Sequence, residues 1–467
     1  MSAWLWVIGS IYLAVLALVA YASWKRSQGA EDYLLAGSNI GVGLGFLTYA
    51  ATLFSTFTLL GMPDFFRSHG VGAWVFLAVS DGAMVFFILW FGFHLRKRIA
   101  EKGFRGVAGL MSACYGNRWA GYVYFAGAFL FLVPYVAIQI RGIAVFLHGA
   151  FPEALPIWGW AVAIVAIMLL YSEIGGLKAI IYSDAMQGLL LLLLTWFVAM
   201  VCINRLGGIE SMFAQVQAAE PALLSTPGPR GLFTPQFLLA SLFGVLFLPA
   251  TQPQLTTRLA IMRDANAMRR MAVGVGIFAI LVILPTIAIG MYGAVLYAAA
   301  PQQEYWAGVL LYEQVDVVAA AVIIGLLAAA MSTADSQIFA LGPALRSLMH
   351  GEERAMMRRT KLAIGLFAIG AMFFAILSSD ELVLLALISF RGTSMLAPMV
   401  LAAVLARGRL GNEVIGATAV VLALFLSTEA GLIPTTLGPV RTDLVLLIGL
   451  GLFTAGSVLY RNRRVQE

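Results

Sequence analysis

The sequence predicts an all-α, polytopic membrane protein, and three features of its composition lead to that prediction. Of its 467 residues, 61% are hydrophobic and 11% are charged, whereas a soluble domain carries about 25% charged residues. Apolar runs of about 20 residues, the length with which a helix crosses the hydrocarbon core of a bilayer, recur from one end to the other. The mean hydropathy is +0.92. We therefore expect no soluble domain of any size.

The apolar runs divide the chain into thirteen segments, and we interpret residues 1–467 as a single membrane-embedded domain. The first segment is too long for the core of a signal peptide and has no small-residue cleavage site before Lys25, so we expect a retained helix. The expected segments are 3–23, 41–62, 72–93, 121–148, 156–174, 179–203, 235–254, 272–298, 314–346, 362–379, 381–405, 412–429 and 442–460.

The distribution of Lys and Arg orients these segments. Of the 29 basic residues, 23 lie in loops that follow odd-numbered segments or at the C-terminus. Those after segment seven are Arg258, Arg263, Arg269 and Arg270, and the opposite side holds only Arg67, Arg205, Arg230 and Arg441. The positive-inside rule then places the N-terminus outside and the C-terminus in the cytoplasm. The net charge of +6 is explained by topology and lipid contact, not by a nucleic-acid surface.

Two segments carry glycine and proline where a helix would break. Segment 41–62 begins with Gly41, Gly43 and Gly45, and segment 235–254 ends in the sequence PATQPQ. They lie five segments apart, as matching broken helices do in transporters built from inverted repeats. The alternative is that these residues form only kinks, which membrane helices tolerate. Unwound backbone at membrane depth is allowed where it lines a cavity, and its free carbonyls could bind an ion.

Several function classes find no support in the sequence. The two cysteines, Cys114 and Cys202, have neither a metal-binding nor a redox spacing. No nucleophile–base pair or phosphate-binding glycine loop occurs, so we expect no enzyme activity. We also find neither the selectivity-filter loop nor the gating-charge helix of a channel.

Two short stretches place a carboxylate and hydroxyls inside membrane segments. The first, GGLKAIIYSDAMQ at 175–187, contains Asp184, and the second, AAAMSTADSQ at 328–337, contains Asp335. An ionisable group at membrane depth costs roughly 2.5–3.5 kcal/mol on insertion scales, so by default it marks an ion or solute path. The sequence therefore predicts a transporter.

Both stretches resemble the motifs of the sodium:solute symporter family, which includes carriers of proline, pantothenate, sugars, sialic acid and monocarboxylates. The first departs from the family at Ser183, where Thr is usual; TRLA at 257–260, followed by Asp264, is also similar. The resemblance covers essentially the whole chain. It implies a leucine-transporter-like fold, in which two inverted five-helix repeats form a ten-helix core at 41–405. One flanking helix (3–23) would precede this core, and two (412–460) would follow it.

The resemblance also implies a principal sodium site between the first broken helix and the eighth core helix. Its ligands would be carbonyls and hydroxyls of Ala51, Phe54, Ala329, Ser332 and Thr333. The spacing agrees independently, because Ala329, Ser332 and Thr333 share one helical face, and hard cations take oxygen ligands. The alternative is that these hydroxyls only bond to the carbonyl four residues earlier.

A second sodium close by, as some members of the family hold, would use Asp184, Asp335 and Ser336. An ion there would neutralise carboxylates that are costly to bury. In the competing interpretation Asp184 lines the exit or bonds only to neighbours in its own segment, namely Tyr182, Ser183 or Lys178.

Arg141 lies deep in segment four, and its guanidinium presents a fork that matches a carboxylate. If it faces the central cavity, the expected ligand is an anionic solute; otherwise it pairs with Asp81 or extends toward the outer face. Arg391 in segment eleven poses the same question. The other candidates for contact with the solute are Ser55, Thr58, Asp81, Gln139 and Gln252.

We therefore expect a sodium-coupled secondary active symporter that imports a small organic, carboxylate-bearing solute by alternating access. The expected location is the plasma membrane, as a multi-pass protein of the bacterial inner membrane. Its partners would be the solute, Na+ and the lipid bilayer, with no nucleic acid and no obligate protein partner. Two alternatives stay open: a proton-coupled symporter of the same fold, and a transporter-like sensory module. The sensory alternative needs a long soluble C-terminal region, and this sequence ends soon after Arg461.

Overall fold

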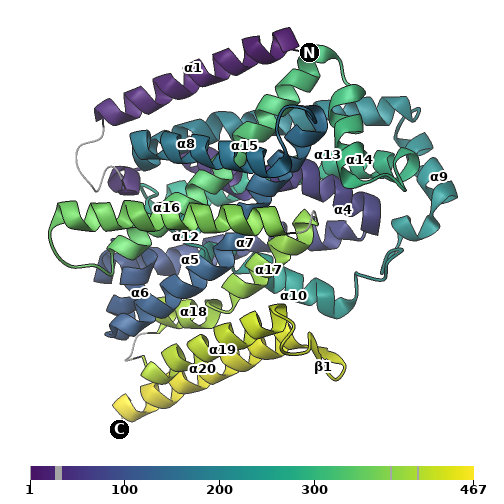
Figure 1. Ribbon diagram of the computed structural model, residues 1–467. Helices are drawn as coiled ribbons and strands as arrows, with labels where there is room; N and C mark the ends of the chain where they lie inside the picture. The colour runs from purple at the N-terminus through teal and green to yellow at the C-terminus, as the bar shows by residue number, and fades with distance from the viewer. Residues whose placement is uncertain (1, 27–33, 379–380, 407–409, 467) are drawn as a thin grey trace.

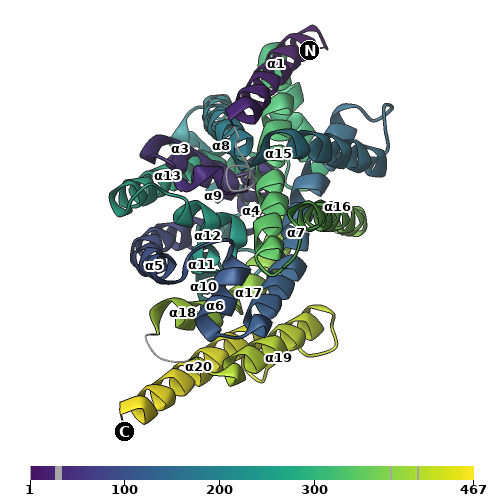
Figure 2. The same cartoon turned by 90° about the vertical axis from the view of Figure 1, so that its left-hand side faces the viewer.

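The computed structural model describes residues 2–26, 34–378, 381–406 and 410–466, and nearly all of its regular structure is helical. Helix α1 (Ser2–Arg26) lies along one side of the molecule (Figures 1 and 2). Helices α19 (Asn412–Glu429) and α20 (Thr442–Gln466) lie together along the opposite side. They are joined through a small antiparallel hairpin of β1 (Thr436–Leu437) and β2 (Val440–Arg441). The other helices fill the space between these two flanks.

The helices between the flanks, in chain order, are α3 (Val42–Leu53), α4 (Met62–His69), α5 (Ser80–Lys102), α6 (Val107–Tyr115), α7 (Arg118–Ala150), α8 (Ile157–Arg205), α9 (Ile209–Ala219), α10 (Pro235–Leu246), α11 (Leu248–Thr251), α12 (Pro253–Ala260), α13 (Ala265–Leu296), α14 (Gln302–Ala307), α15 (Asp316–Arg346), α16 (Glu353–Leu377), α17 (Leu382–Ser394) and α18 (Ala397–Leu405). Short 3-10 or π-helical turns are η1 (Ala36–Ser38), η2 (Phe57–Gly61), η3 (Val75–Val79), η4 (Pro221–Leu224) and η5 (Gly308–Tyr312).

Among the described residues, nine helices are long and apolar enough to cross a membrane, and eleven if each of two bent helix pairs counts as one span. Two shorter apolar helices, Ile157–Leu169 and Pro235–Leu246, coincide with the remaining segments expected from the sequence. The chain is therefore a multi-pass membrane protein. The count of thirteen spans stays a prediction, because these two helices are shorter than the bilayer requires.

Helices α7 and α15 form the centre of the bundle. In the most apolar stretch of α7, 83% of the residues are buried, against 17% in α1. Helix α1 exposes Trp6, Leu13 and Leu18 on its outer face, as expected for side chains that meet lipid rather than water. The chemistry-bearing residues of 328–337 therefore lie on one of the two most enclosed helices, while α1 covers the bundle from outside.

The helix break expected in segment 41–62 is present. Helix α3 ends at Leu53, Phe54 adopts an extended conformation (φ −102°, ψ 123°), and the chain resumes as η2 and α4 at an angle of 53°. The interruption leaves the carbonyls of the last turn of α3 without partners inside the helix. The carbonyl oxygens at the end of α3 are therefore available to groups on other helices.

The break expected in segment 235–254 is also present, between α11 and α12. Gln252 is extended (φ −96°, ψ 120°) and precedes Pro253, the first residue of α12. Proline disfavours the helical conformation in the residue before it, and it has no N–H to continue the ladder of hydrogen bonds. The second broken helix therefore follows directly from the order Gln-Pro in the sequence.

The boundary expected between segments 156–174 and 179–203 is present as a kink inside α8 at Gly176, whose φ of +61° suits glycine. Two features of the fold differ from the sequence-based expectation. Segment 381–405 is not one helix: α17 and α18 meet at an angle of 41°. The short helices α6, α9 and α14 connect longer ones and were not expected, because they lack a long apolar run.

Candidate functional site

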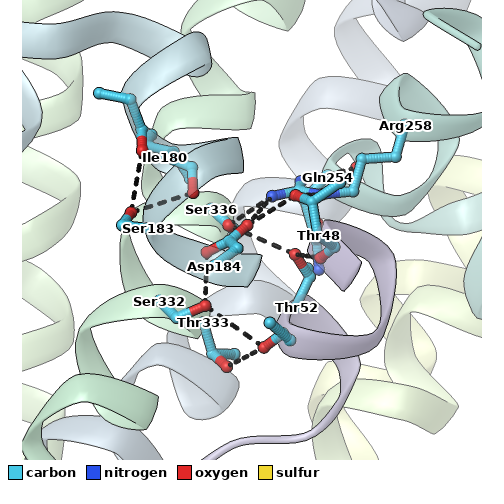
Figure 3. Close-up of polar contacts among 12 residues, drawn as sticks. Thr48, Thr52, Ile180, Ser183, Asp184, Gln254, Arg258, Ser332, Thr333 and Ser336 are labelled. Atoms are coloured by element: carbon cyan, nitrogen blue, oxygen red, sulfur yellow. Dashed lines mark hydrogen bonds and ion pairs between the residues drawn. The ribbon is translucent and has the colours of Figure 1, made fainter. Parts of the chain in front are cut away.

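Four helices meet at a buried polar cluster near the break in α3 (Figure 3). Helix α3 contributes Thr48 and Thr52, α8 contributes Asp184, α12 contributes Arg258, and α15 contributes three residues of the MSTADS stretch, Ser332, Thr333 and Ser336. None of these side chains belongs to a residue more than 2% exposed. Because buried polar groups are costly unless they are paired, the arrangement of donors and acceptors here is tightly determined.

The centre of the cluster is an ion pair between Arg258 and Asp184. Arg258 Nη2 donates to Asp184 Oδ2 at 2.9 Å and to Ser336 Oγ at 2.6 Å. Its Nε donates to Thr48 Oγ1 at 2.9 Å, and its Nη1 to the carbonyl of Gln254 in its own helix at 3.2 Å. One guanidinium therefore connects α12 to three other helices.

The carboxylate of Asp184 receives two further hydrogen bonds. Thr48 Oγ1 donates to Oδ2 at 2.7 Å, and Ser332 Oγ donates to Oδ1 at 2.5 Å. Its hydrogen-bond partners among the described residues thus come from α3, α12 and α15. Ser183 instead returns its hydroxyl to the carbonyls of Ala179 and Ile180, both at 3.0 Å.

The broken end of α3 faces the hydroxyls of α15. Thr333 Oγ1 donates to the carbonyl of Ala51 at 3.2 Å, and Ser332 Oγ lies 3.4 Å from the same oxygen. That carbonyl is free because α3 stops at Leu53. The cluster therefore joins three uncharged oxygens from two helices, a donor set suited to a hard monovalent cation.

Asp335 takes no part in the hydrogen bonds of the ion pair. It is 2% exposed, and within the described residues its carboxylate makes no hydrogen bond or ion pair. Along α15 it follows Ile324 and Ala328, which pack on Tyr12 and Leu16 of α1.

Comparison with known proteins identifies the family. The model of the sodium:solute symporter family matches residues 33–407. This chain belongs to the sodium:solute symporter family. The family resemblance predicted from the sequence is thus confirmed, and the members of this family are transporters rather than enzymes.

Curated relatives and solved structures extend this result. This chain is 26% identical to the sodium/pantothenate symporter of Escherichia coli (strain K12) over 302 residues. The matched region covers 62% of this chain and 59% of that protein. It is 26% identical to the Haemophilus influenzae sodium/pantothenate symporter over 70% of this chain and 68% of that one. It is 23% identical to the Bacillus subtilis high-affinity proline transporter PutP, over 73% of this chain and 72% of that protein.

Its fold matches a sodium-coupled sialic acid symporter solved in a substrate-bound outward-open state, with a TM-score of 0.77 over 98% of both chains at 18% identity. A nucleobase-cation-symport-1 family transporter in a closed conformation matches with a TM-score of 0.58 at 14% identity, over 94% of this chain and 96% of that one. At these identities the two structures establish a shared fold.

Ser55 and Thr58, two of the predicted solute residues, lie where the chain becomes helical again after the break. The backbone N–H of Ser55 donates to Thr58 Oγ1 at 3.0 Å, and that of Phe57 donates to Ser55 Oγ at 3.3 Å. This reciprocal arrangement satisfies backbone donors that a helix start leaves open. Both hydroxyls are therefore engaged in local structure.

Three other predicted solute residues carry buried polar groups. Gln139 Oε1 and Gln252 Nε2 have no hydrogen-bond partner among the described residues, although both side chains are 0% exposed. Asp81 is 7% exposed, and in the described ranges it forms no ion pair with Arg141. Buried polar atoms without a protein partner are places where water, an ion or a solute can bind.

The two membrane arginines of the sequence analysis have partners near the helix ends. Arg141 is half-buried, and its contacts include the carbonyl of Ile376 at 3.5 Å. Arg391 Nε lies 3.5 Å from Asp443 Oδ2, and its guanidinium lies over the ring of Phe237. Asp443 belongs to α20, so Arg391 ties the core to a flanking helix.

The most connected residue of the cluster, Arg258, was not among the predicted site residues. It was counted with the basic loop residues after segment seven, and the structure corrects this, because Arg258 is 2% exposed and lies inside the bundle. The one available signal was its place in the TRLA stretch shared with the family. Nothing local in the sequence links Arg258 to Asp184, 74 positions away.

Proposed function

We propose that this protein is a sodium-coupled secondary active symporter that imports a small organic solute by alternating access. The observation that carries the proposal is the meeting of the Ser332 and Thr333 hydroxyls with the carbonyl of Ala51 at a helix break. Membership of the family supports it, as do the names of the relatives, which are pantothenate, proline and sialic acid symporters.

The proposed first sodium site consists of oxygens from Ala51, Phe54, Ala329, Ser332 and Thr333. Ala51 and Phe54 belong to the end of α3, and the other three share a face of α15. All five residues are buried. In the described structure Thr333 donates to the carbonyl of Ala51 and Ser332 donates to Asp184, and Na+ would take the two hydroxyl oxygens and this carbonyl as ligands instead. The second sodium that the sequence predicts on Asp184, Asp335 and Ser336 is not part of this proposal.

Such a site explains how an ion could drive transport. Because its ligands come from α3 and α15, Na+ would bind best in the state that holds these helices together. An ion shifts a conformational equilibrium only through its different affinity for the two states. The membrane potential adds about 2.3 kcal/mol per charge per 100 mV to the driving force.

The proposed architecture is the one expected from the sequence: thirteen spans, with a 5+5 inverted-repeat core at 41–405. One flanking helix precedes this core and two follow it. The N-terminus would lie outside and the C-terminus in the cytoplasm. The two broken helices, α3–α4 and α10–α12, support the repeat because they lie five segments apart. The bacterial sources of the relatives support a bacterial inner membrane.

For the solute we propose a carboxylate-bearing molecule. Pantothenate, proline and sialic acid, the solutes in the relatives' names, all carry a carboxylate. Arg141 is proposed as its partner, although this requires the side chain to exchange its present contacts. Gln139 and Gln252 supply unsatisfied polar atoms, Asp81 a buried carboxylate, and Ser55 and Thr58 hydroxyls beside the first helix break.

Transport into proteoliposomes tests the proposal. The purified full chain is reconstituted, and uptake of labelled pantothenate, proline, sialic acid, lactate and a neutral sugar is measured under an inward Na+ gradient, an inward proton gradient, or neither. We expect uptake of one carboxylate under the Na+ gradient alone. Uptake driven by protons in K+ medium would favour proton coupling, and binding without uptake would favour the sensory alternative.

A further inference from the structure

A fixed positive charge already occupies the place where the sequence predicts a second sodium ion. One nitrogen, Arg258 Nη2, lies 2.9 Å from Asp184 Oδ2 and 2.6 Å from Ser336 Oγ. These are two of the three residues predicted to hold that ion. A guanidinium stays charged at every physiological pH and cannot leave with the solute.

Asp184 also accepts hydrogen bonds from two other helices. Thr48 donates to the same Oδ2 at 2.7 Å, and Ser332 donates to Oδ1 at 2.5 Å. With Arg258 these donors satisfy both carboxylate oxygens from three helices. A cation entering here would have to displace hydrogen-bond donors that are at most 2% exposed, which would leave these buried donors without their partner.

The third residue of the predicted second site takes no part in this group. Asp335 forms no hydrogen bond or ion pair with Arg258 or Asp184 among the described residues, although it is buried. Asp184 and Ser336 share the guanidinium, and Asp335 lies outside that hydrogen-bonded group.

We propose that Arg258 is a resident counter-ion that takes the place of a second coupling sodium, so that this carrier binds one Na+ per chain. This inference rests on the proposed sodium-coupled function and specifies its stoichiometry. Asp184 is then neutralised by the protein itself in every state that keeps the ion pair. The single exchangeable cation binds beside it, at Ser332 and Thr333.

The test counts bound ions in the detergent-solubilised full chain, with radioactive Na+ alone as the probe. We expect binding of wild-type protein to saturate at one Na+ per chain. Arg258→Gln leaves Asp184 without its counter-ion, so it should saturate at two. The double variant Arg258→Gln/Asp184→Asn should return to one, and Arg258→Lys, which keeps the charge, should remain at one. The matched control is Arg461→Gln, which removes an arginine paired with Glu413 away from the cluster and should also bind one.

The outcomes separate the two proposals. Wild-type protein that binds two Na+ overturns the resident counter-ion directly, even if Arg258→Gln fails to fold. A folded Arg258→Gln protein that still binds one overturns it as well. Wild-type protein that binds no Na+ overturns sodium coupling itself, which is a different result from either.

Discussion

Arg258 and Asp184, from helices α12 and α8, form an ion pair of 2.9 Å in which the two side chains are 2% and 0% exposed. The same two residues hold Thr48 of α3 and the serines Ser332 and Ser336 of α15. Both broken helices are therefore fastened to α8 and α15 through one pair of charges. A motion that separates α12 from α8 therefore has to break the ion pair, whereas a motion that keeps it intact has to move these two helices together.

The first prediction concerns the proposed sodium ligand Thr333. Thr333→Val removes the hydroxyl that faces Ala51 while keeping the shape of the side chain. Loss of one oxygen ligand to a cation, at about 1.5–3 kcal/mol, should weaken Na+ binding by about ten- to a hundredfold. The measurement is an Na+ titration of thermal stability. Thr393→Val is the matched control, because this buried hydroxyl bonds only to carbonyls of its own helix; equal loss of Na+ affinity in both variants would argue against the site.

The second prediction concerns the stability of the ion pair. Asp184→Asn or Arg258→Gln alone leaves a buried charge without its partner, which should lower the free energy of unfolding by about 3–5 kcal/mol. The double variant should recover a large part of that loss, because no charge is then left unpaired. Denaturant unfolding of all three proteins in detergent gives the coupling energy.

Glu413→Gln serves as the reference for this cycle, since it breaks the half-exposed pair with Arg461. Glu413→Gln should lower the free energy of unfolding by at most about 1 kcal/mol. Single and double variants of the buried pair that lose strictly additive amounts of stability would show that Arg258 and Asp184 do not act together.

The third prediction concerns a close approach between α13 and α4. A Cβ atom at Gly290 would lie 2.5 Å from Phe66 Cβ and 2.6 Å from the carbonyl oxygen of Pro63. Gly290→Ala should therefore push α4 away and destabilise the protein by about 1–3 kcal/mol. Gly370→Ala, where a Cβ would meet nothing within 4 Å, should be neutral or slightly stabilising. Melting temperatures of the two variants check this; a tolerated Gly290→Ala would mean that the two helices are not in tight contact.

The fourth prediction concerns Arg67, which fastens the second half of the first broken helix. Arg67 Nη1 donates to the carbonyls of Tyr297 and Ala300 at 2.7 and 2.9 Å, and Nη2 lies 2.7 Å from Asp64 Oδ1. Arg67→Lys keeps the charge but loses the fork, so α4 should separate more easily from the end of α13. We expect a broader distance distribution between spin labels at Ser68 and Gln303.

Arg263→Gln is the control for this measurement, because Arg263 pairs with Asp264 while 61% exposed. It should leave the distances unchanged. If the spin labels report the same narrow distance distribution in both variants, Arg67 does not hold α4 against the end of α13.

Much of the fold could be predicted because it follows from local chemistry. Long apolar runs give the spans, and the order Gln252-Pro253 gives the second break. The glycines of segment 41–62 lie in the first turn of α3 and not at its break at Phe54. The break between α17 and α18 had no comparable local signal in the sequence apart from Pro398, which lies just after it. The short connecting helices were not predicted, because segments were assigned only where an apolar run was long enough to cross a membrane.

The site was predicted in part, for a physical reason. Ser332 and Thr333 were predicted through the resemblance to the family's motif, and their spacing agrees with it because it places both on one helical face. The partner of Asp184 was missed because Arg258 lies in a helix only eight residues long, Pro253–Ala260, where an arginine resembles a loop charge. Pairing across 74 positions depends on packing, which no local pattern encodes.

Uptake driven by a sodium gradient tests the central claim most directly. Proteoliposomes with the wild-type chain and with Thr333→Val are given the labelled carboxylates under an inward Na+ gradient, with K+ replacing Na+ as the reference. The account predicts accumulation of one carboxylate by the wild-type chain that requires Na+, and a shift of its Na+ dependence to about tenfold higher concentration or more in Thr333→Val. Accumulation that is equal in Na+ and K+, or a Na+ dependence unaffected by Thr333→Val, would contradict it.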